Sequence, residues 1–428
     1  MGYMKAETLR KKYPRFVYQK YFYRVKRGDL KMTFCFKIEP NIVLKPRIII
    51  KNIPEGRLEA IGRRALNNLV FHLGLMEIPS YWKATCSPEI AVQAGYLDKN
   101  QIAWWHDLMI KGMGQYFYEN KIDWRSPDFL KISVNLGVAA QVLETTSLEL
   151  KDRYLVPLAG GKDSLVTLEA LKKKGESVNC FLLNPTKIIK RVARIAGIEN
   201  PVVVERRIDP ALLGLNKQGY LNGHTPFTAL LSFASVLCAV LFDYKHIAFS
   251  NEKSANEGNI LYLGKNINHQ WAKTSEFEKM FKAYCQKYLA KNVNYSSFLR
   301  KYTELQIAKM FSQYPKYFAA FSSCNASMKI GSATGHRWCS KCPKCLFTYL
   351  ILYPFLAKKD LHKIFGQDLF ENKNLLPILK KLTGRGTHKP FECVGTYRET
   401  NEALSLGLIK ARKEGEIPYL LQKYDEIK

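Results

Sequence analysis

Acidic residues are scarce in this chain of 428 residues, which has 37 Asp and Glu against 66 Lys and Arg. The resulting formal net charge of +29 concentrates anions around the protein. Two kinds of anionic partner would be attracted by this charge: nucleic acid, or a small substrate such as a nucleotide diphosphate sugar with carboxylates. A lysine-rich proteome would account for part of the same excess. Two basic clusters that also contain tyrosines, Arg10–Arg15 and Lys20–Arg27, are compatible with an RNA contact.

Long hydrophobic runs are also missing. No apolar run approaches the roughly 20 residues that cross a bilayer, and Met1–Lys20 lacks the apolar core of a secretory signal. No internal repeat or low-complexity linker is evident. With 47% hydrophobic and 24% charged residues the composition is globular. We therefore expect a cytoplasmic enzyme without a membrane span, divided at this length into two or three packed domains that share a cleft.

A diglycine ends an apolar run in LVPLAGGKDS, residues 155–164. Tyr154–Leu158 predicts a buried strand, and Ser164–Lys174 predicts a helix because its leucines recur on one face. Gly160 and Gly161 then lie at a strand-to-helix turn. Glycines there let the backbone approach an anion, and the first free N–H groups of the helix point at it. An ordinary glycine turn is the alternative, but GGKDS with these flanks favours a phosphate site.

Strands and helices alternate after this loop. The sequence predicts strands at Asn179–Asn184, Val202–Glu205 and Ile247–Ser250, and helices at Lys187–Ala196 and Thr225–Phe242. This alternation is typical of a parallel, doubly wound α/β sheet with helices on both faces. Ligands of such sheets bind at the carboxyl ends of the strands, which is where the diglycine loop lies.

Two polar clusters are expected near the loop. Asn251 and Glu252 follow a predicted strand end, which makes them candidate cofactor-binding residues, Glu252 for Mg²⁺ or ribose. His269 comes shortly before a predicted helix, and a surface or hydrogen-bonded histidine fits this position as well as a catalytic one does. Ser275 and Glu278 fit a capping box at the start of that helix.

Four of the ten cysteines form the pattern C-x14-C-x2-C-x2-C, and these are Cys324, Cys339, Cys342 and Cys345. Cysteines two residues apart can direct both sulfurs at one point, as tetrahedral Zn²⁺ requires at about 2.3 Å. In a reducing cytoplasm such a group indicates a metal more often than disulfides. We expect a structural Zn²⁺ site, with unligated cysteines as the alternative. Core thiols are expected at Cys35, Cys86, Cys180, Cys238 and Cys285.

The diglycine motif resembles the pyrophosphate loop of the ATP pyrophosphatases, or PP-loop enzymes, usually written SGGxDS. These enzymes cut ATP between its α- and β-phosphates, and one branch, the 7-cyano-7-deazaguanine synthases, has a zinc site of four cysteines. The resemblance implies a HUP-like nucleotide domain whose pyrophosphate is held by Gly160, Gly161 and Ser164. It also implies that Lys162 offsets the phosphate charge and that Asp163 approaches Mg²⁺. Ala159 stands where the family usually has serine.

A closer resemblance is to the MurL family, the ATP-dependent UDP-N-acetylmuramoyl-L-alanyl-L-glutamate epimerases. It covers about Tyr154–Thr396 and rests on six motifs in order: GGKDS (160–164), NGHTPFTA (222–229), SNEKSANEGN (250–259), NHQWAKTSEFE (268–278), WCSKCPKC (338–345) and KPFECVGT (389–396). The resemblance implies that the terminal L-Glu of a peptidoglycan precursor, a UDP-muramoyl dipeptide, becomes D-Glu. It implies a requirement for ATP and Mg²⁺, with AMP and pyrophosphate released.

Several residues compete for the proton transfer at the glutamate Cα. Cys393 is a candidate because a thiolate paired with a second acid serves the cofactor-free glutamate racemases, although it also fits a core position beside Phe391. Glu392, His388 and His269 are rivals. The candidate catalytic residues are therefore Lys162, Asp163, His269 and Cys393. Candidate clamps for phosphates or carboxylates are Lys273, Arg337 and Lys389.

The sequence as a whole predicts an α/β enzyme with three parts. These are an N-terminal α+β domain at 1–150, a PP-loop ATP-binding domain at 151–320, and a Cys-rich helical region at 321–428. The chief alternative function is a PP-loop tRNA or nucleobase modification enzyme, which shares adenylation and would make nucleic acid a partner. A non-catalytic nucleotide-binding or nucleic-acid-binding protein is a third possibility. The oligomeric state is not indicated.

Overall fold

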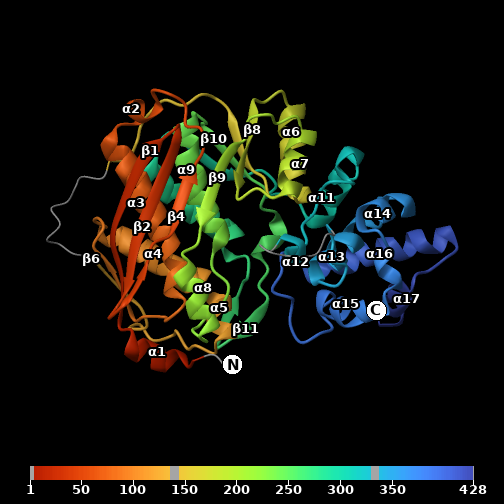
Figure 1. Ribbon diagram of the computed structural model, residues 1–428. Coiled ribbons are helices and arrows are strands. Elements are labelled where there is room, and N and C mark those ends of the chain that lie inside the picture. Colours follow the sequence, from red (N-terminus) through yellow and green to blue (C-terminus); the bar gives the residue numbers. More distant parts are fainter. Residues whose placement is uncertain (1–3, 135–143, 329–336, 428) are drawn as a thin grey trace.

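The structure is a computed structural model that describes residues 4–134, 144–328 and 337–427 (Figure 1). One eleven-stranded mixed sheet runs through it in the order β13-β10-β7-β8-β9-β4-β2-β1-β5-β6, with β3 paired to β2. A separate antiparallel ribbon consists of β11 (Ile260–Tyr262) and β12 (Lys265–Ile267). The mixed α/β fold that the sequence predicts is confirmed.

Five neighbouring strands of the sheet are parallel: β7 (Tyr154–Pro157), β8 (Val178–Leu183), β9 (Val202–Arg207), β10 (His246–Phe249) and β13 (Asn294–Ser297). Successive side chains of a strand point to opposite faces. Leu155 of β7 accordingly lies in one apolar core with helix α9 (Phe227–Phe242), whereas the next residue, Val156, packs with Leu171 of α6 (Lys162–Lys173). Helices thus cover both faces of this part of the sheet.

The N-terminal half continues the same sheet, because β4 pairs antiparallel with β9. Its strands are β1 (Arg15–Lys26), β2 (Asp29–Ile38), β3 (Ile42–Leu44), β4 (Arg47–Ile50), β5 (Glu89–Val92) and β6 (Lys131–Val134). Helix α3 (Arg63–Trp82) packs against β1, β2 and α9. The sheet and its larger apolar core therefore extend across residue 150. The division into three domains stays a prediction.

One predicted helix is divided in the structure. The sequence predicts a single amphipathic helix over Arg57–Leu75, but α2 (Arg57–Ile61) ends at Gly62, whose φ of 78° interrupts the helix before α3 begins. Moreover, α3 is buried on nearly all sides, because the sheet lies on one side of it and α9 on another. Of the sheet segment predicted at Phe129–Leu143, β6 covers 131–134, and 135–143 lie outside the described residues.

The C-terminal part is helical and surrounds a second apolar core, seen in blue in Figure 1. Its helices are α11 (Glu304–Phe311), α12 (Asn325–Met328), α13 (Pro343–Leu352), α14 (Lys358–Phe365), α15 (Leu376–Leu382), α16 (Tyr397–Glu414) and α17 (Tyr419–Ile427). The other α-helices of the described chain are α1 (Ala6–Lys12), α4 (Lys99–Gly112), α5 (Gly114–Glu119), α7 (Lys187–Ile195), α8 (Pro210–Lys217) and α10 (Ser275–Tyr284).

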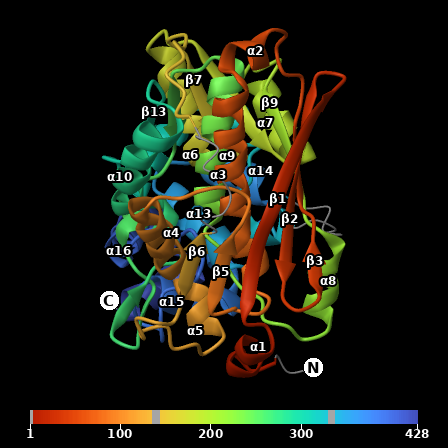
Figure 2. The same ribbon diagram turned by 90° about the vertical axis from the view of Figure 1, so that its left-hand side faces the viewer.

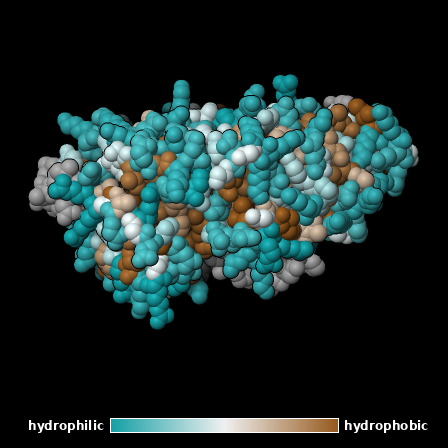
Figure 3. Space-filling view, turned by 90° about the horizontal axis from the view of Figure 1, so that it is seen from above, coloured by the Kyte–Doolittle hydropathy of each residue, from teal (hydrophilic) through white to brown (hydrophobic). Residues whose placement is uncertain are grey.

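The described helices include none with the length and apolar character needed to cross a membrane. Seen from above, the surface is mostly hydrophilic, with smaller hydrophobic patches between the polar groups (Figure 3). The five thiols expected in the core, Cys35, Cys86, Cys180, Cys238 and Cys285, are all buried, as predicted.

Candidate active site

The diglycine loop joins β7 to α6 at the carboxyl end of the parallel strands. Gly160 has a φ of +86°, a conformation that a residue with a side chain rarely adopts. Gly161 is the N-cap residue of α6, and no side chain caps the helix there. The first N–H groups of a twelve-residue helix are therefore open at the loop, which is the arrangement that binds phosphates.

Lys162 lies under the loop between two carboxylates. Its Nζ contacts Asp163 Oδ1 and Glu304 Oε2, and the side chains of Lys162 and Glu304 are only 3% and 1% exposed. Burial opposes the charge of Lys162, but the two carboxylates outweigh it and raise the pKa of Lys162. Burial also raises the pKa of Glu304 to about 7, because Lys162 offsets only part of it. The two ion pairs hold the Lys162 side chain in one orientation.

Lysines gather around Asp163. Burial opposes its ionisation, but Lys162, Lys344 and Lys273 outweigh burial and lower the pKa of Asp163. Lys162 and Lys344 are buried and Lys273 is half-buried. Lys389 is buried as well; its Nζ is 3.0 Å from Glu257 Oε1, and it lies within electrostatic reach of His269. An accumulation of buried cations beside open helix N–H groups suits a polyphosphate such as ATP, and an ionised carboxylate among them suits Mg²⁺.

Cys393 lies within this group of lysines. The Nζ of Lys273 is 3.2 Å from Cys393 Sγ, and the Nζ of Lys344 donates a hydrogen bond to the Cys393 carbonyl. Burial opposes the charge of Lys273, but Cys393 and Glu252 outweigh it and raise the pKa of Lys273. Cys393 itself is partly exposed, so it is not the core thiol that the alternative reading of the sequence required.

Asn251 and Glu252 follow β10 and are both buried, as their position after a strand suggests. Asn251 donates to Ser297 Oγ at 3.1 Å. No described side chain hydrogen-bonds to or pairs with the Glu252 carboxylate, although Glu252 contributes to the electrostatics of Lys273 and Glu304. The Glu252 carboxylate is therefore free to bind a ligand group.

Two histidine rings, tilted by 45° to each other, are in contact at the edge of the site. The rings of His224 and His269 have centroids 4.3 Å apart, and His269 Nδ1 hydrogen-bonds to Gln115 Oε1. Burial, helped by Lys273, lowers the pKa of His269 to about 4. Burial and the neighbouring His269 lower the pKa of His224 to about 3. Both imidazoles are neutral at pH 7 and can accept a proton.

The depressed pKa of His269 predicts acid sensitivity. Below pH 6.5 the unfolded chain protonates this histidine, but the folded chain does so only near pH 4, so the free energy of unfolding falls across that window. A shift from 6.5 to about 4 corresponds to at most about 3 kcal/mol. Urea unfolding from pH 7 to pH 4 should therefore show a shallower pH dependence for His269→Gln. An unchanged dependence, equal to that of the exposed control His362→Gln, would contradict the shift.

The four predicted metal ligands come together. The Sγ atoms of Cys324, Cys339, Cys342 and Cys345 lie within 4.8 Å of one another. Cys345 Sγ is 3.7 Å from Cys339 Sγ and 3.5 Å from Cys342 Sγ. A tetrahedron of sulfurs at about 2.3 Å from Zn²⁺ has edges of about 3.8 Å, whereas a disulfide needs about 2.05 Å. The donor set therefore fits a structural Zn²⁺ with no position left for substrate.

The cysteine cluster borders the diglycine loop. Ser322 N donates to the Gly160 carbonyl at 3.0 Å, and Ser322 Oγ accepts from Cys324 N at 3.2 Å. Ser323 lies so close to Gly161 that a Cβ there would stand 3.5 Å from Ser323 Cβ. Since Lys344 lies between Cys342 and Cys345, the same cluster also positions the lysine that holds the Cys393 carbonyl.

Metal analysis should find about one Zn per chain, and none in Cys342→Ser. Because metal binding at such sites contributes to folding, removing it should lower the melting temperature by roughly 10 °C. Cys35→Ala, whose thiol is outside the cluster, should keep its metal and melt close to the unchanged protein. A metal-free protein with an unchanged melting temperature would refute the assignment.

Not every expected site residue lies here. Arg337 donates to the carbonyls of Phe318, Phe321, Lys363 and Ile364, so its guanidinium joins the segment after Tyr317 to the last turn of α14 instead of clamping a ligand. The expected capping box at Ser275 is wrong: Thr274 caps α10, and Glu278 binds Ser297 N and Arg300. The His388 ring lies beside Phe391, with centroids 5.7 Å apart, whereas Glu392, which accepts a hydrogen bond from Asn325, stays within electrostatic reach of Lys344 and Cys393.

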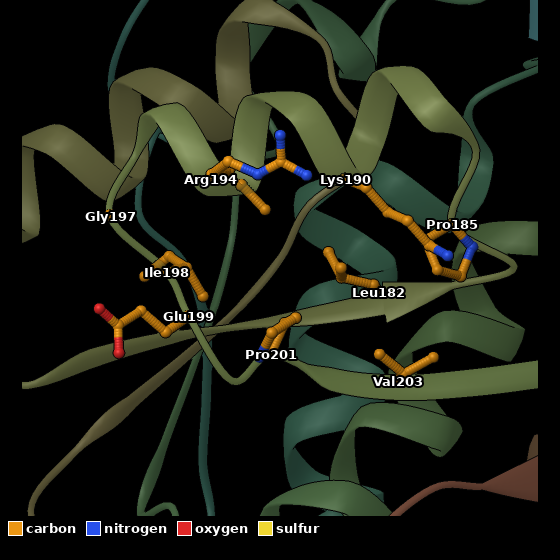
Figure 4. A pocket seen from close by; sticks show the side chains of 10 residues that line it. Leu182, Pro185, Lys190, Arg194, Gly197, Ile198, Glu199, Pro201 and Val203 are labelled. Atoms are coloured by element: carbon orange, nitrogen blue, oxygen red, sulfur yellow. The ribbon is translucent and has the colours of Figure 1, made fainter.

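Three members of the site were not singled out from the sequence: Glu304, Lys344 and His224. Glu304 begins α11 inside a capping box, which in sequence reads as an ordinary helix start. Lys344 and His224 lie inside motifs WCSKCPKC and NGHTPFTA, so those motifs were the available signal. A cavity of about 460 Å³ between α7 and strands β8 and β9 is lined by none of the predicted site residues (Figure 4).

Fold and site together define a mixed α/β protein with a lysine-rich diglycine site beside a four-cysteine cluster. The chain belongs to the MurL family: the MurL N-terminal domain matches residues 7–298 and the MurL C-terminal domain matches residues 320–426.

Curated relatives carry the name UDP-N-acetyl-alpha-D-muramoyl-L-alanyl-L-glutamate epimerase. One from Xanthomonas oryzae pv. oryzae (strain MAFF 311018) is 37% identical over 382 residues, which is 89% of this chain and 82% of the relative. One from Micromonospora sp. is 37% identical over 329 residues, covering 76% and 72% of the two chains. One from Salinispora tropica is 36% identical over 328 residues, covering 76% and 70%.

Proposed function

We propose that this protein is an epimerase that converts the terminal L-Glu of UDP-N-acetylmuramoyl-L-Ala-L-Glu to D-Glu during peptidoglycan precursor synthesis. The names of three relatives that share most of its length support this reaction. The observation in the molecule that carries the proposal is the group of buried lysines that joins the diglycine loop to Cys393. This group places a candidate for ATP binding next to a candidate for proton transfer.

Activation by ATP explains why these two functions should be neighbours. The Cα–H of a peptide-linked glutamate is a very weak acid because the adjacent carboxylate already carries negative charge. As an acyl-adenylate, that group becomes a mixed anhydride whose carbonyl accepts the enolate charge. The oxygen of the carboxylate attacks the α-phosphorus of ATP, the bond to the β-phosphate breaks, and pyrophosphate leaves. After inversion, water releases the free acid and AMP.

The loop residues receive the phosphates in this proposal. The backbone at Gly160 and Gly161, with Ser164 Oγ in the first turn of α6, lies where the pyrophosphate would be held. Lys162 and Lys344 compensate its charge. Mg²⁺ would be held by Asp163 and Glu252, and it would supply charge compensation for the phosphate oxygens. These roles rest on the positions of the carboxylates and lysines around the diglycine loop.

Proton transfer is assigned to Cys393 and His269. Neutral His269 removes the Cα proton and becomes an imidazolium, and the Cys393 thiol returns a proton on the opposite face; the Lys273 ammonium, 3.2 Å from Cys393 Sγ, then faces the thiolate that is left. His269 is neutral at pH 7 and is also within electrostatic reach of Lys273. An epimerase that inverts a centre needs one group to remove the proton and another to return one on the opposite face. Groups of this kind typically accelerate proton transfer by about 10²–10⁴-fold.

The decisive assay incubates the purified protein with UDP-N-acetylmuramoyl-L-Ala-L-Glu and Mg-ATP in deuterated water. D-Glu, AMP and deuterium at the glutamate Cα are expected, and omission of ATP should abolish all three. Absence of both D-Glu and AMP would exclude the proposed function. Formation of ADP in place of AMP would exclude the acyl-adenylate. Inversion without deuterium would exclude deprotonation at Cα.

A further inference from the structure

The hairpin formed by β1 and β2 is strongly basic. Its residues 15–38 include one acidic side chain, Asp29, and seven basic ones: Arg15, Lys20, Arg24, Lys26, Arg27, Lys31 and Lys37. Arg15 forms ion pairs with Glu39 and Glu89, and Asp29 forms one with Lys51. The other six basic side chains have no acidic partner among the described residues.

The strand register puts most of these charges on one face. Lys20 lies opposite Cys35, Phe22 opposite Thr33, and Arg24 opposite Lys31, and residues directly opposite in an antiparallel pair share a face. The alternate residues of β2, such as Met32 and Phe34, lie in the apolar core with α3. In Figure 2 the hairpin forms the right-hand side of the molecule, with α3 and α9 on its inner side. The basic face is therefore turned outward.

Apolar side chains are exposed among these charges. Phe22 is 54% exposed, and Val43, which lies opposite Lys37 on the neighbouring strand β3, is 48% exposed. Among residues 4–134, 144–328 and 337–427, β1 beyond Tyr18 pairs with β2 alone, since its register with β5 ends there. Lys20, Arg24 and Lys26 thus line an open sheet edge, and their charges oppose pairing with the same edge of a second copy. A partner for this face has to be anionic and able to receive apolar side chains.

We propose that the outer face of the β1–β2 hairpin binds an anionic phospholipid surface. Clustered lysines and arginines are attracted to anionic headgroups, and interleaved apolar side chains enter the boundary between headgroups and acyl chains. RNA fits less well, because sheets that bind single strands stack several bases on aromatic rings. Here Phe22 is the aromatic residue of β1 on the outer face. The hydroxyls of Tyr21 and Tyr23 bond to Asn67 of α3 on the inner side.

Sedimentation with vesicles tests this surface directly. The full-length protein should bind vesicles of phosphatidylcholine with phosphatidylglycerol at low salt, bind them weakly at high salt, and leave pure phosphatidylcholine vesicles unbound. The triple variant Lys20→Glu, Arg24→Glu, Lys26→Glu should bind about 100-fold more weakly, since each basic residue near the surface contributes about fivefold. Phe22→Ser should weaken binding with the charge unchanged.

A matched control changes the same net charge elsewhere. Lys279→Glu, Lys282→Glu and Lys413→Glu alter exposed residues of α10 and α16, and this variant should keep most of its vesicle binding. Equal loss in both triple variants would mean that only the net charge matters, and would overturn the proposal. Equal binding to neutral vesicles would overturn it too, as would tighter binding of single-stranded RNA at the same salt. Circular dichroism checks the fold of each variant, and none of the changed residues belongs to the candidate active site.

Discussion

Replacing Asp163 with alanine is expected to stop AMP formation, with a fall of roughly 10³-fold or more, since charge compensation at a phosphoryl oxygen supplies several kcal/mol. Asp163 is the carboxylate next to the diglycine loop, and three lysines lower its pKa, so it is ionised at neutral pH. Without it, the loop loses the carboxylate proposed to bind Mg²⁺, and Lys162 loses one of its two partners. The measurement is AMP release from Mg-ATP in the presence of the muramoyl dipeptide.

A control separates this effect from unfolding. Asp128→Ala changes an exposed aspartate outside the candidate site and should leave AMP formation within about twofold, as surface substitutions usually do. Asp163→Ala should keep the circular dichroism spectrum of the unchanged protein. If this variant still releases AMP at an undiminished rate, the diglycine loop has no part in the reaction.

Cys393→Ala should separate the two halves of the reaction. Formation of D-Glu should fall by about 10²–10⁴-fold, the usual contribution of a positioned acid or base, while AMP formation continues. The reason is geometric: Cys393 Sγ contacts Lys273, whereas Lys162 at the diglycine loop contacts Asp163 and Glu304. Chiral analysis of glutamate and AMP measurement on the same sample give both rates.

The outcomes of the Cys393 experiment are distinct. Undiminished D-Glu formation would remove Cys393 from proton transfer. Loss of AMP together with D-Glu would indicate that Cys393 acts on the nucleotide half of the site, through Lys273 or Lys344. The control Cys35→Ala removes a buried thiol of β2 and should change neither rate.

The fold was predictable where a local pattern carried its own boundary signals. The β7–α6 unit has a continuous apolar run, two glycines and a helical leucine pattern, and the structure agrees within two residues at each boundary. The sequence also predicts a strand at Arg47–Ile50, which the structure has as β4. The break at Gly62 was missed because a glycine inside a periodic apolar pattern gives no sign of its backbone conformation. The pairing of β4 with β9 was also missed, because strands 150 residues apart carry no local signal of partnership.

The site divides in the same way. The cysteine spacing predicted four sulfurs around one point, and the structure brings them together, because three of the four lie within seven residues. Glu304 could not be found, since its role depends on α11 packing against α6 and closing over Lys162. The same holds for Arg337, a candidate clamp in the sequence, whose guanidinium binds backbone carbonyls of Phe318 and of Lys363 in α14.

The sequence by itself determined the mixed α/β class, the diglycine turn, the cysteine group and the family resemblance, because each depends on residues close together in the chain. Only the tertiary structure decided which charges meet. Lys162, Lys273 and Lys344 are spread over more than 180 residues, yet folding brings all three to Asp163. Burial in a medium of low polarity strengthens the interactions between charged groups. The neighbouring lysines therefore keep Asp163 ionised, and burial keeps His269 neutral.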